Sequence, residues 1–179
     1  MSIILGIDPG SRKTGFGIIQ VDGRPRYLGS GIIRLPDVPL PERLRIIADG
    51  ISDLIEQYRP AQAAVEEVFM ARNAASALKL GQARGAALVA CARAELDISE
   101  YTARQVKQAV VGTGAAAKEQ VQHMVRHLLD LPALPPEDAA DALACALCHV
   151  QVGGALKRLG KNRAGVAVAR GLRAGRAAR

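Results

Sequence analysis

The chain has 179 residues, 49% of them hydrophobic, which is enough to fill the core of one ordinary domain and excludes disorder throughout. No stretch approaches the ~20 apolar residues of a membrane span, and the first residues lack the order of a signal peptide, so we expect a soluble cytoplasmic protein. The three cysteines fit reduced thiols, and the formal net charge of +7 indicates an anionic partner.

The hydrophobic period changes several times along the chain, in an order typical of an α/β protein. The first apolar run, residues 3–7, has the length and β-branched content of a buried strand. Asp22 and Gly23 form a hairpin signal between the next two strand-like segments, so three consecutive strands open the chain. The predicted strands are 3–7, 14–21, 26–35, 61–69 and 98–101, and the predicted helices are 41–58, 73–96, 103–112, 118–131 and 137–152.

The excess positive charge lies at the C-terminal end of the chain. Residues 156–179 contain eight Lys or Arg and no acid, and subtracting these from 24 basic and 17 acidic residues leaves 16 against 17 for residues 1–155. We therefore predict one folded domain over 1–155 and a basic, flexible tail over 156–179. The tail is interpreted as a polycationic arm for an anionic target, with a purely solubilising segment as the alternative.

Carboxylates recur at the ends of the predicted elements. Asp8 ends the first strand, and Glu66 and Glu67 lie near the end of the strand at 61–69. Asp138 and Asp141 open the last helix, where a spacing of three residues puts them on one helical face. Each acid alone also has an ordinary interpretation, as a turn cap or as a helix N-terminal charge favoured by the helix dipole.

Strand ends and a helix N-terminus can converge on one point, where several acids would repel one another unless a divalent metal held them. A ligand set made only of oxygen suits Mg²⁺ or Mn²⁺ better than zinc. The sequence therefore indicates a metal site built from carboxylates. Strand alternation alone does not choose between Glu66 and Glu67.

Four stretches of the sequence are long and chemically particular: GIDPGSRKTGFG, VEEVFMARNAASALKLGQARG, EYTARQVKQAVVGTGAAAKEQVQHMV and EDAADALA. In this order, and over residues 1 to about 150, they resemble the RuvC family of Holliday junction resolvases. The resemblance implies a ribonuclease H-like α/β fold, a mixed five-stranded sheet flanked by helices, in a two-fold homodimer. It also implies a structure-selective endonuclease that resolves four-way DNA junctions by paired symmetric nicks during recombination and repair.

The same resemblance assigns residues to the reaction. It implies two Mg²⁺ ions in each active site, with Mn²⁺ as a plausible substitute, ~4 Å apart and on either side of the phosphorus under attack. Some family members carry histidine where Asp138 stands. The catalytic and metal-binding acids that it implies are Asp8, Glu66, Asp138 and Asp141.

Four further residues match family positions that contact DNA. Lys107 and Lys118 stand where the family places cations near the scissile phosphate, in catalytic and DNA-binding roles. Phe69 is expected to stack on a base at the junction. Arg72 is expected to contact a phosphate. The alternatives are solvated helix charges for the two lysines and a core position for Phe69. The family also implies a branch-migration complex of the RuvA and RuvB type as a partner.

Two other function classes share some of these features. An actin-like sugar kinase or ATPase opens with a similar strand, acidic residue and glycine-rich turn, but it needs two such domains. A non-catalytic DNA-binding module explains the basic tail but not the acids.

Two smaller motifs have structural interpretations. Cys145 and Cys148 lack the second ligand pair of a zinc site, and Gly81 and Gly85 permit close helix packing, either within the chain or across a dimer.

Overall fold

The computed structural model describes residues 1–67 and 74–158, and these contain five strands and five helices in the predicted order. The strands are β1 (Ser2–Asp8), β2 (Lys13–Asp22), β3 (Arg24–Arg34), β4 (Gln62–Glu67) and β5 (Asp97–Thr102). The helices are α1 (Leu40–Tyr58), α2 (Ala74–Arg93), α3 (Ala103–Val111), α4 (Lys118–Leu128) and α5 (Glu137–Arg158).

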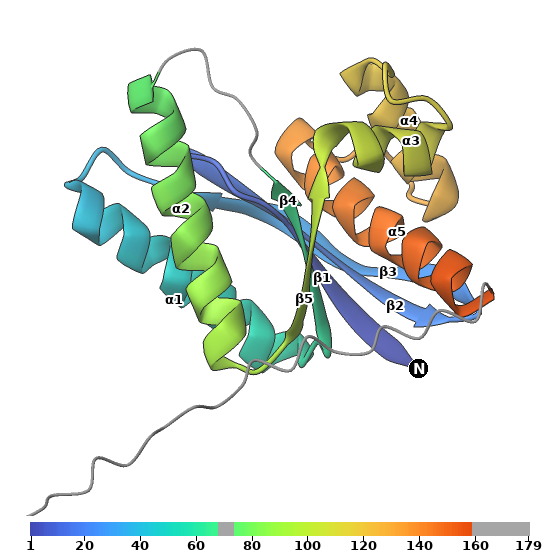
Figure 1. Ribbon diagram of the computed structural model, residues 1–179, viewed down its shortest axis with the longest axis horizontal. Coiled ribbons are helices and arrows are strands. Elements are labelled where there is room, and N and C mark those ends of the chain that lie inside the picture. Colours follow the sequence, from blue (N-terminus) through green and yellow to red (C-terminus); the bar gives the residue numbers. More distant parts are fainter. Residues whose placement is uncertain (68–73, 159–179) are drawn as a thin grey trace, which may run out of the picture.

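The strands form one sheet in the order β3-β2-β1-β4-β5. The first three strands pair antiparallel, and the pair of β2 and β3 is the hairpin that Asp22 and Gly23 predict, whereas β4 pairs parallel with both β1 and β5. Figure 1 shows α1 and α2 on one face of this sheet and α3, α4 and α5 on the other. The predicted mixed five-stranded sheet flanked by helices is confirmed.

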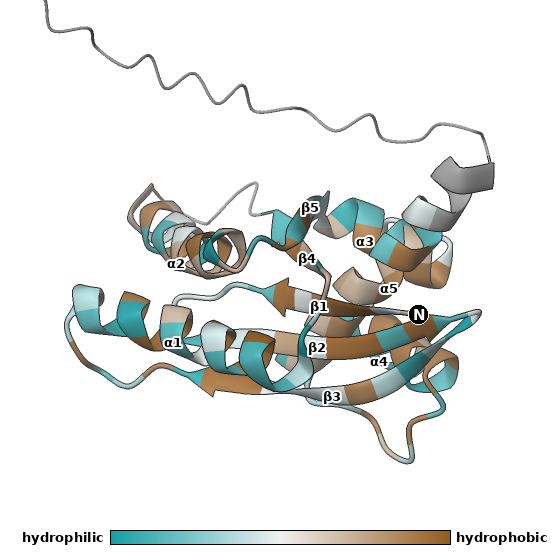
Figure 2. Ribbon diagram, turned by 90° about the horizontal axis from the view of Figure 1, so that it is seen from below, coloured by the Kyte–Doolittle hydropathy of each residue, from teal (hydrophilic) through white to brown (hydrophobic). Residues whose placement is uncertain are grey.

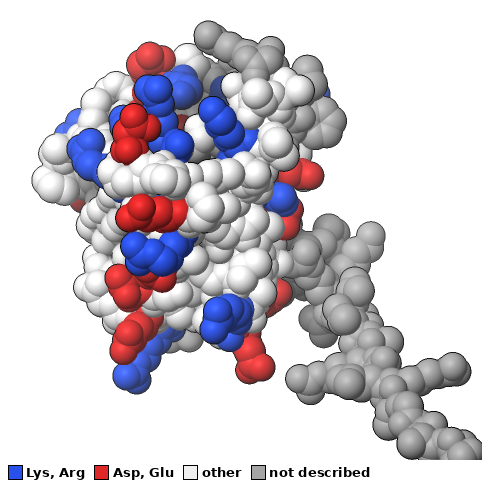
Figure 3. Space-filling model, turned by 90° about the vertical axis from the view of Figure 1, so that its left-hand side faces the viewer, with Lys and Arg blue, Asp and Glu red and all other residues white. Residues whose placement is uncertain are grey.

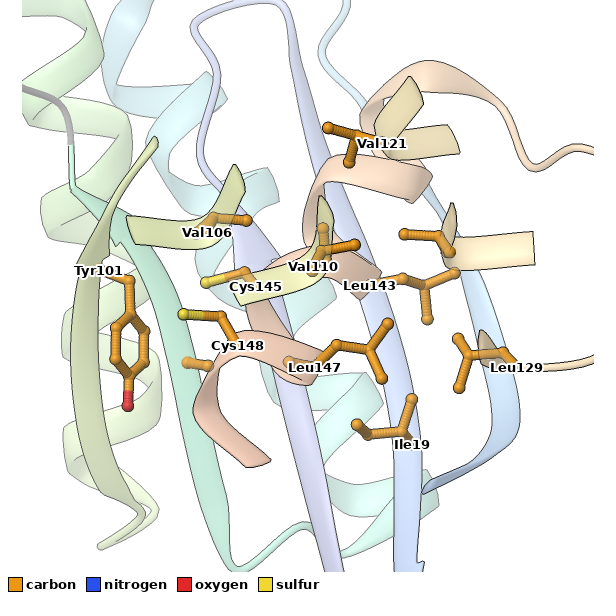
Figure 4. Close-up of a cluster of buried hydrophobic side chains, with 14 of the residues drawn as sticks. Ile19, Tyr101, Val106, Val110, Val121, Leu129, Leu143, Cys145, Leu147 and Cys148 are labelled. Carbon is orange, nitrogen blue, oxygen red and sulfur yellow. The ribbon is translucent and has the colours of Figure 1, made fainter. Parts of the chain in front are cut away.

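Each face of the sheet has its own hydrophobic core, because alternate residues of a strand point to opposite faces. Leu5 and Ile7 of β1 pack with α1 and α2, whereas Ile4 packs with the helices of the opposite face. Figure 4 shows this second core, in which Cys145 and Cys148 lie among apolar side chains. Figure 2 shows hydrophobic segments in the strands and hydrophilic residues along α1, which is exposed on one side.

Helix α5 packs unusually close to the sheet because glycines face it. A Cβ atom added at Gly6 would lie 2.0 Å from the carbonyl oxygen of Ala142. One added at Gly15 would lie 2.0 Å from that of Asp138. Only a residue without a side chain fits at these two positions of β1 and β2. The glycines therefore fix the start of α5 directly against the ends of two strands.

Two helices end earlier than the hydrophobic pattern predicts. Helix α2 ends at Arg93 rather than at 96, and Glu95 follows with a φ of 57°. Helix α4 ends at Leu128 rather than at 131, and Asp130 follows with a φ of 50°. A residue in the left-handed region stops a helix even where the apolar spacing continues.

Helix α5 is longer than predicted and runs to Arg158 instead of 152. The prediction ended it before two consecutive glycines, but a glycine inside a helix costs only about 1 kcal/mol relative to alanine. The helix therefore includes the first three residues of the segment predicted as a tail. The rest of that segment, and the end of the strand predicted over 61–69, lie outside the described residues. Within the described part of the chain, no helix combines the length and the apolar character that a membrane span requires.

Candidate active site

The parallel pair β1 and β4 places two acids side by side on one face of the sheet. Ile7 pairs with Val65, and both belong to the core under α1 and α2. Because side chains alternate along a strand, the next residues, Asp8 and Glu66, point to the opposite face, toward α5. Glu67 points to the α2 side. The strand register thus distinguishes Glu66 from Glu67, which the residues alone do not.

The start of α5 brings Asp138 and Asp141 to the same place. Asp138 lies directly over Gly15 of β2, and Gly15 pairs with Asp8 in the antiparallel ladder of β1 and β2. Asp141 follows one helical turn later and interacts electrostatically with both Asp8 and Glu66. The four acids predicted as ligands therefore converge at one end of the sheet, from two strands and one helix N-terminus.

Burial and mutual repulsion perturb these acids strongly. Burial, followed by the charges of Asp141 and Asp138, raises the pKa of Asp8 from 3.8 to about 7. Burial, followed by the charges of Asp8 and Asp141, raises the pKa of Glu66 from 4.5 to about 8. Burial also raises the pKa of Asp141. Perturbed carboxylates of this kind gather at functional sites, and here they lack enough positive charge to balance them.

The donor set of this site is made of carboxylate oxygens, which suit Mg²⁺ and Mn²⁺. Within residues 1–67 and 74–158, no three or more His, Cys, Asp or Glu side chains stand close enough together to hold a metal ion as they lie. After burial, which is the largest cause, the charges of the neighbouring acids add to the raised pKa values of Asp8 and Glu66, so these carboxylates act on one another. A divalent cation between the acids would relieve that repulsion, so the residues fit such a group.

Two lysines approach the acids from the neighbouring helices. Lys107 on α3 acts on Glu66 and Asp141, and its charge opposes the rise in their pKa. Lys118, the first residue of α4, acts in the same sense on Asp8, Glu66 and Asp141. The structure thus brings both predicted lysines to the carboxylates. Phe69 and Arg72, the other two predicted residues, lie outside the described residues.

Two charged residues at the site were not predicted from the sequence. Glu137 Oε1 forms an ion pair and hydrogen bond with Lys118 Nζ, which raises the pKa of that lysine. Lys13 Nζ lies 3.6 Å from Asp138 Oδ2. The signal for Glu137 was its place directly before Asp138 in the first turn of α5. Lys13 gave no local signal, because its contact depends on how α5 packs against β2.

The structure tests the two smaller motifs, the cysteines and the glycines of α2. Cys91, Cys145 and Cys148 are free and buried, so the prediction of reduced thiols is confirmed. Cys148 Sγ donates a weak hydrogen bond to the backbone carbonyl of Gln105 at 3.7 Å. A Cβ added at Gly81 or Gly85 of α2 would meet no atom of the described chain within 4 Å. Close helix packing at these glycines within the chain is therefore excluded for the part described.

The chain matches, over residues 4–149, the family described as Crossover junction endodeoxyribonuclease RuvC. The protein of that name from Aeromonas hydrophila is 65% identical over 150 residues, which cover 83% of this chain and 87% of the relative. Thermus thermophilus RuvC, solved in complex with Holliday junction substrate, has a TM-score of 0.82 and 39% identity, and the match covers 90% of this chain and 98% of that one. The yeast mitochondrial Holliday junction resolvase Ydc2 shares the fold, with a TM-score of 0.63, 11% identity, and coverage of 87% of this chain and 82% of that one.

Proposed function

The chain belongs to the RuvC family of crossover junction endodeoxyribonucleases, and on this premise we propose that its carboxylate cluster hydrolyses phosphodiester bonds in four-way DNA junctions. The family resemblance and the ribonuclease H-like fold that it implied are thereby confirmed. The observation that carries the proposal is the convergence of four acids, two of them with strongly raised pKa values. The proposed ligands and catalytic groups are Asp8, Glu66, Asp138 and Asp141.

The cluster is proposed to hold two Mg²⁺ ions, with Mn²⁺ as a substitute. When bound, such ions generate a nucleophile from water and stabilise the leaving oxygen of an in-line displacement. The contribution of the chain is to hold the oxygen ligands in place. Asp8 and Glu66 stand on neighbouring strands, and α5, fixed against Gly15, carries the other two acids. Both strand acids must lose their protons before they can bind a cation.

The two lysines are proposed to act on the phosphate. Lys107 and Lys118 face the carboxylates, so a scissile phosphate placed over the acids lies within reach of their ammonium groups. A fixed cation there binds substrate and stabilises the charge that develops in the transition state. Outside the described residues, the proposal also keeps Phe69 as a base-stacking group and Arg72 as a phosphate contact. We also propose that the substrate is a four-way DNA junction, that a complex of the RuvA and RuvB type is a partner, and that the protein is cytoplasmic.

Two symmetric cuts require two active sites, and we assign the dimer contact to α2. Leu78 and Val89 are 65% and 56% exposed, so α2 presents two large apolar side chains to solvent. Gly81 and Gly85 lie between them at the three-, four- and seven-residue steps that make one stripe along a helix. Because the two glycines at the centre of this stripe have no side chains, a second helix can approach α2 closely there. Figure 3 shows acidic and basic side chains interspersed on the face that α1 and α2 form, which does not suit a polyanion.

Leu78→Glu is expected to convert the dimer to a monomer and to uncouple the two nicks, because it places a charge in the proposed helix contact. Sedimentation velocity of wild type and variant over a concentration series measures the change. Leu134→Glu is the matched control, since Leu134 is 44% exposed and lies between α4 and α5. A Leu78→Glu protein that sediments like wild type would show that α2 is not the dimer contact.

The proposed activity predicts paired, symmetric nicks in a synthetic four-way junction and ligatable ends in the products. The test compares a four-way junction with a linear duplex of the same sequence, with and without divalent metal, on denaturing gels. Equal nicking of both substrates would contradict a junction-selective enzyme. ATP turnover without strand scission would favour the actin-like kinase class, and metal-independent binding alone would favour a DNA-binding module.

A further inference from the structure

Two cations stand directly opposite each other at the site end of the β2–β3 hairpin. Lys13 opens β2 and is the ladder partner of Arg34, the last residue of β3. Like charges placed directly opposite on antiparallel strands destabilise a sheet. Nothing in the local turn chemistry requires two cations here. An anion bound between the two cations would reduce the repulsion that destabilises the free protein.

Both cations project from the face of the sheet that carries the active site. Lys13 reaches Asp138 at the start of α5, with 3.6 Å between Nζ and Oδ2. Directly opposed residues of a ladder share a face, so Arg34 projects to the same side. The neighbouring Ile33 packs in the core under α1, which agrees with this assignment because alternate residues face opposite sides.

Both cations are available to bind a ligand. Arg34 is exposed and makes no ion pair with any residue in the described part of the chain. The Lys13 side chain is 51% exposed, and an ion pair with that much solvent contact contributes little stability. Lys13 can therefore exchange its partner at little cost.

The position of the pair relative to the acids suggests which anion it meets. Lys13 and Arg34 stand on β2 and β3, on one side of β1 in the sheet. Lys107 stands on α3, which follows β5 at the opposite edge. The carboxylate cluster thus has cations on both sides. A DNA strand that crosses the acids from the β5 side to the β3 side carries one of its phosphates toward β3.

We propose that Lys13 and Arg34 together bind one backbone phosphate of the cleaved strand, on the β3 side of the carboxylates. The inference rests on the proposed function, because it takes the strand to cross the acids. A guanidinium binds phosphate through two parallel N–H donors, and the ammonium of Lys13 adds a point charge beside it. Phosphate contacts fix register and orientation and read no sequence. The pair is therefore assigned a role in positioning the strand at the acids.

The test is a salt titration of junction binding without divalent metal, for wild type, Arg34→Gln and the Lys13→Gln/Arg34→Gln double variant. Loss of one neutralised phosphate is expected to flatten the slope of log affinity against log salt by about 0.9 in the double variant. Arg34→Gln alone is expected to show part of this change without altering any contact to a carboxylate. Arg26→Gln is the matched control, because Arg26 is exposed near the other end of β3. It is expected to keep the wild-type slope.

Two further readouts separate this role from a structural one. Because Arg34→Gln relieves the like-charge contact and keeps the ion pair of Lys13 with Asp138, the melting temperature of this variant is expected to equal or exceed that of wild type. In single-turnover cleavage, the protein concentration for half-maximal rate is expected to rise several-fold, more than the maximal rate falls. Wild-type slopes in a double variant whose parent protein nicks junctions would overturn the inference and leave the proposed function standing. A wild-type protein that nicks no junction would instead contradict the proposed function, whatever the slopes.

Discussion

Asp8→Asn is expected to lower the rate of junction cleavage by several orders of magnitude while junction binding persists or tightens. Asparagine keeps the volume of the side chain but removes a charged oxygen from the centre of the carboxylate cluster. The loss falls on the chemical step, because metal-assisted hydrolysis depends on the ligand set. Binding is spared because the acid repels DNA phosphates. Single-turnover cleavage and a separate binding titration measure the two effects.

Glu67→Gln is the matched control for this substitution. Glu67 is next to Glu66 in sequence but points to the α2 side of the sheet, so its neutralisation is expected to change cleavage only mildly. An Asp8→Asn protein that cleaves within about tenfold of wild type would show that Asp8 only caps the turn after β1, since loss of a metal ligand costs far more.

The affinity of the cluster for divalent metal is expected to rise steeply with pH. The pKa values of Asp8 and Glu66 are raised to about 7 and about 8, so below these values a metal ion must displace a proton from each acid. Each displaced proton lowers the apparent affinity up to about tenfold per pH unit. Between pH 8 and pH 6 we therefore expect a fall of roughly two orders of magnitude or more, measured by calorimetric titration of Mn²⁺ into the DNA-free protein.

The same acids determine how the stability of the metal-free protein changes with pH. Their folded pKa values exceed the unfolded ones, so the folded state binds more protons between about pH 4 and pH 8, and stability falls as pH rises through this window. Divalent metal at a free concentration of a hundred times its dissociation constant stabilises the folded state by about 2.7 kcal/mol. The melting temperature is thus expected to rise with Mg²⁺ more at pH 8 than at pH 6. An equal rise at both pH values would contradict the linkage.

The order of the elements could be predicted because hydrophobic periodicity is local. The hairpin signal at Asp22 and Gly23 predicted the antiparallel pair of β2 and β3, and the apolar run before Asp8 predicted the strand that carries this acid. The positions at which α2 and α4 end could not be predicted. They depend on Glu95 and Asp130, which adopt left-handed backbone angles where the apolar spacing continues.

The composition of the site depended on contacts between distant elements, which no window of sequence contains. The choice of Glu66 over Glu67 follows from the pairing of Ile7 with Val65, and before that it came only from family resemblance. The contact of Lys13 with Asp138 requires α5 to lie on Gly15 of β2. Sequence reasoning identified the acids by their positions at element ends, and the family resemblance supplied Lys107 and Lys118. It missed Lys13, which reaches Asp138 across the fold.

We propose that four carboxylates from β1, β4 and α5 bind the divalent ions used in cleavage. The most direct test is an anomalous difference map from crystals saturated with Mn²⁺, recorded for wild type and for Asp8→Asn under the same conditions. We expect anomalous density bounded by Asp8, Glu66, Asp138 and Asp141 in the wild type, weakened or lost in the variant. Density elsewhere with none among these acids, or equal density in both proteins, would show that these carboxylates do not hold the ions.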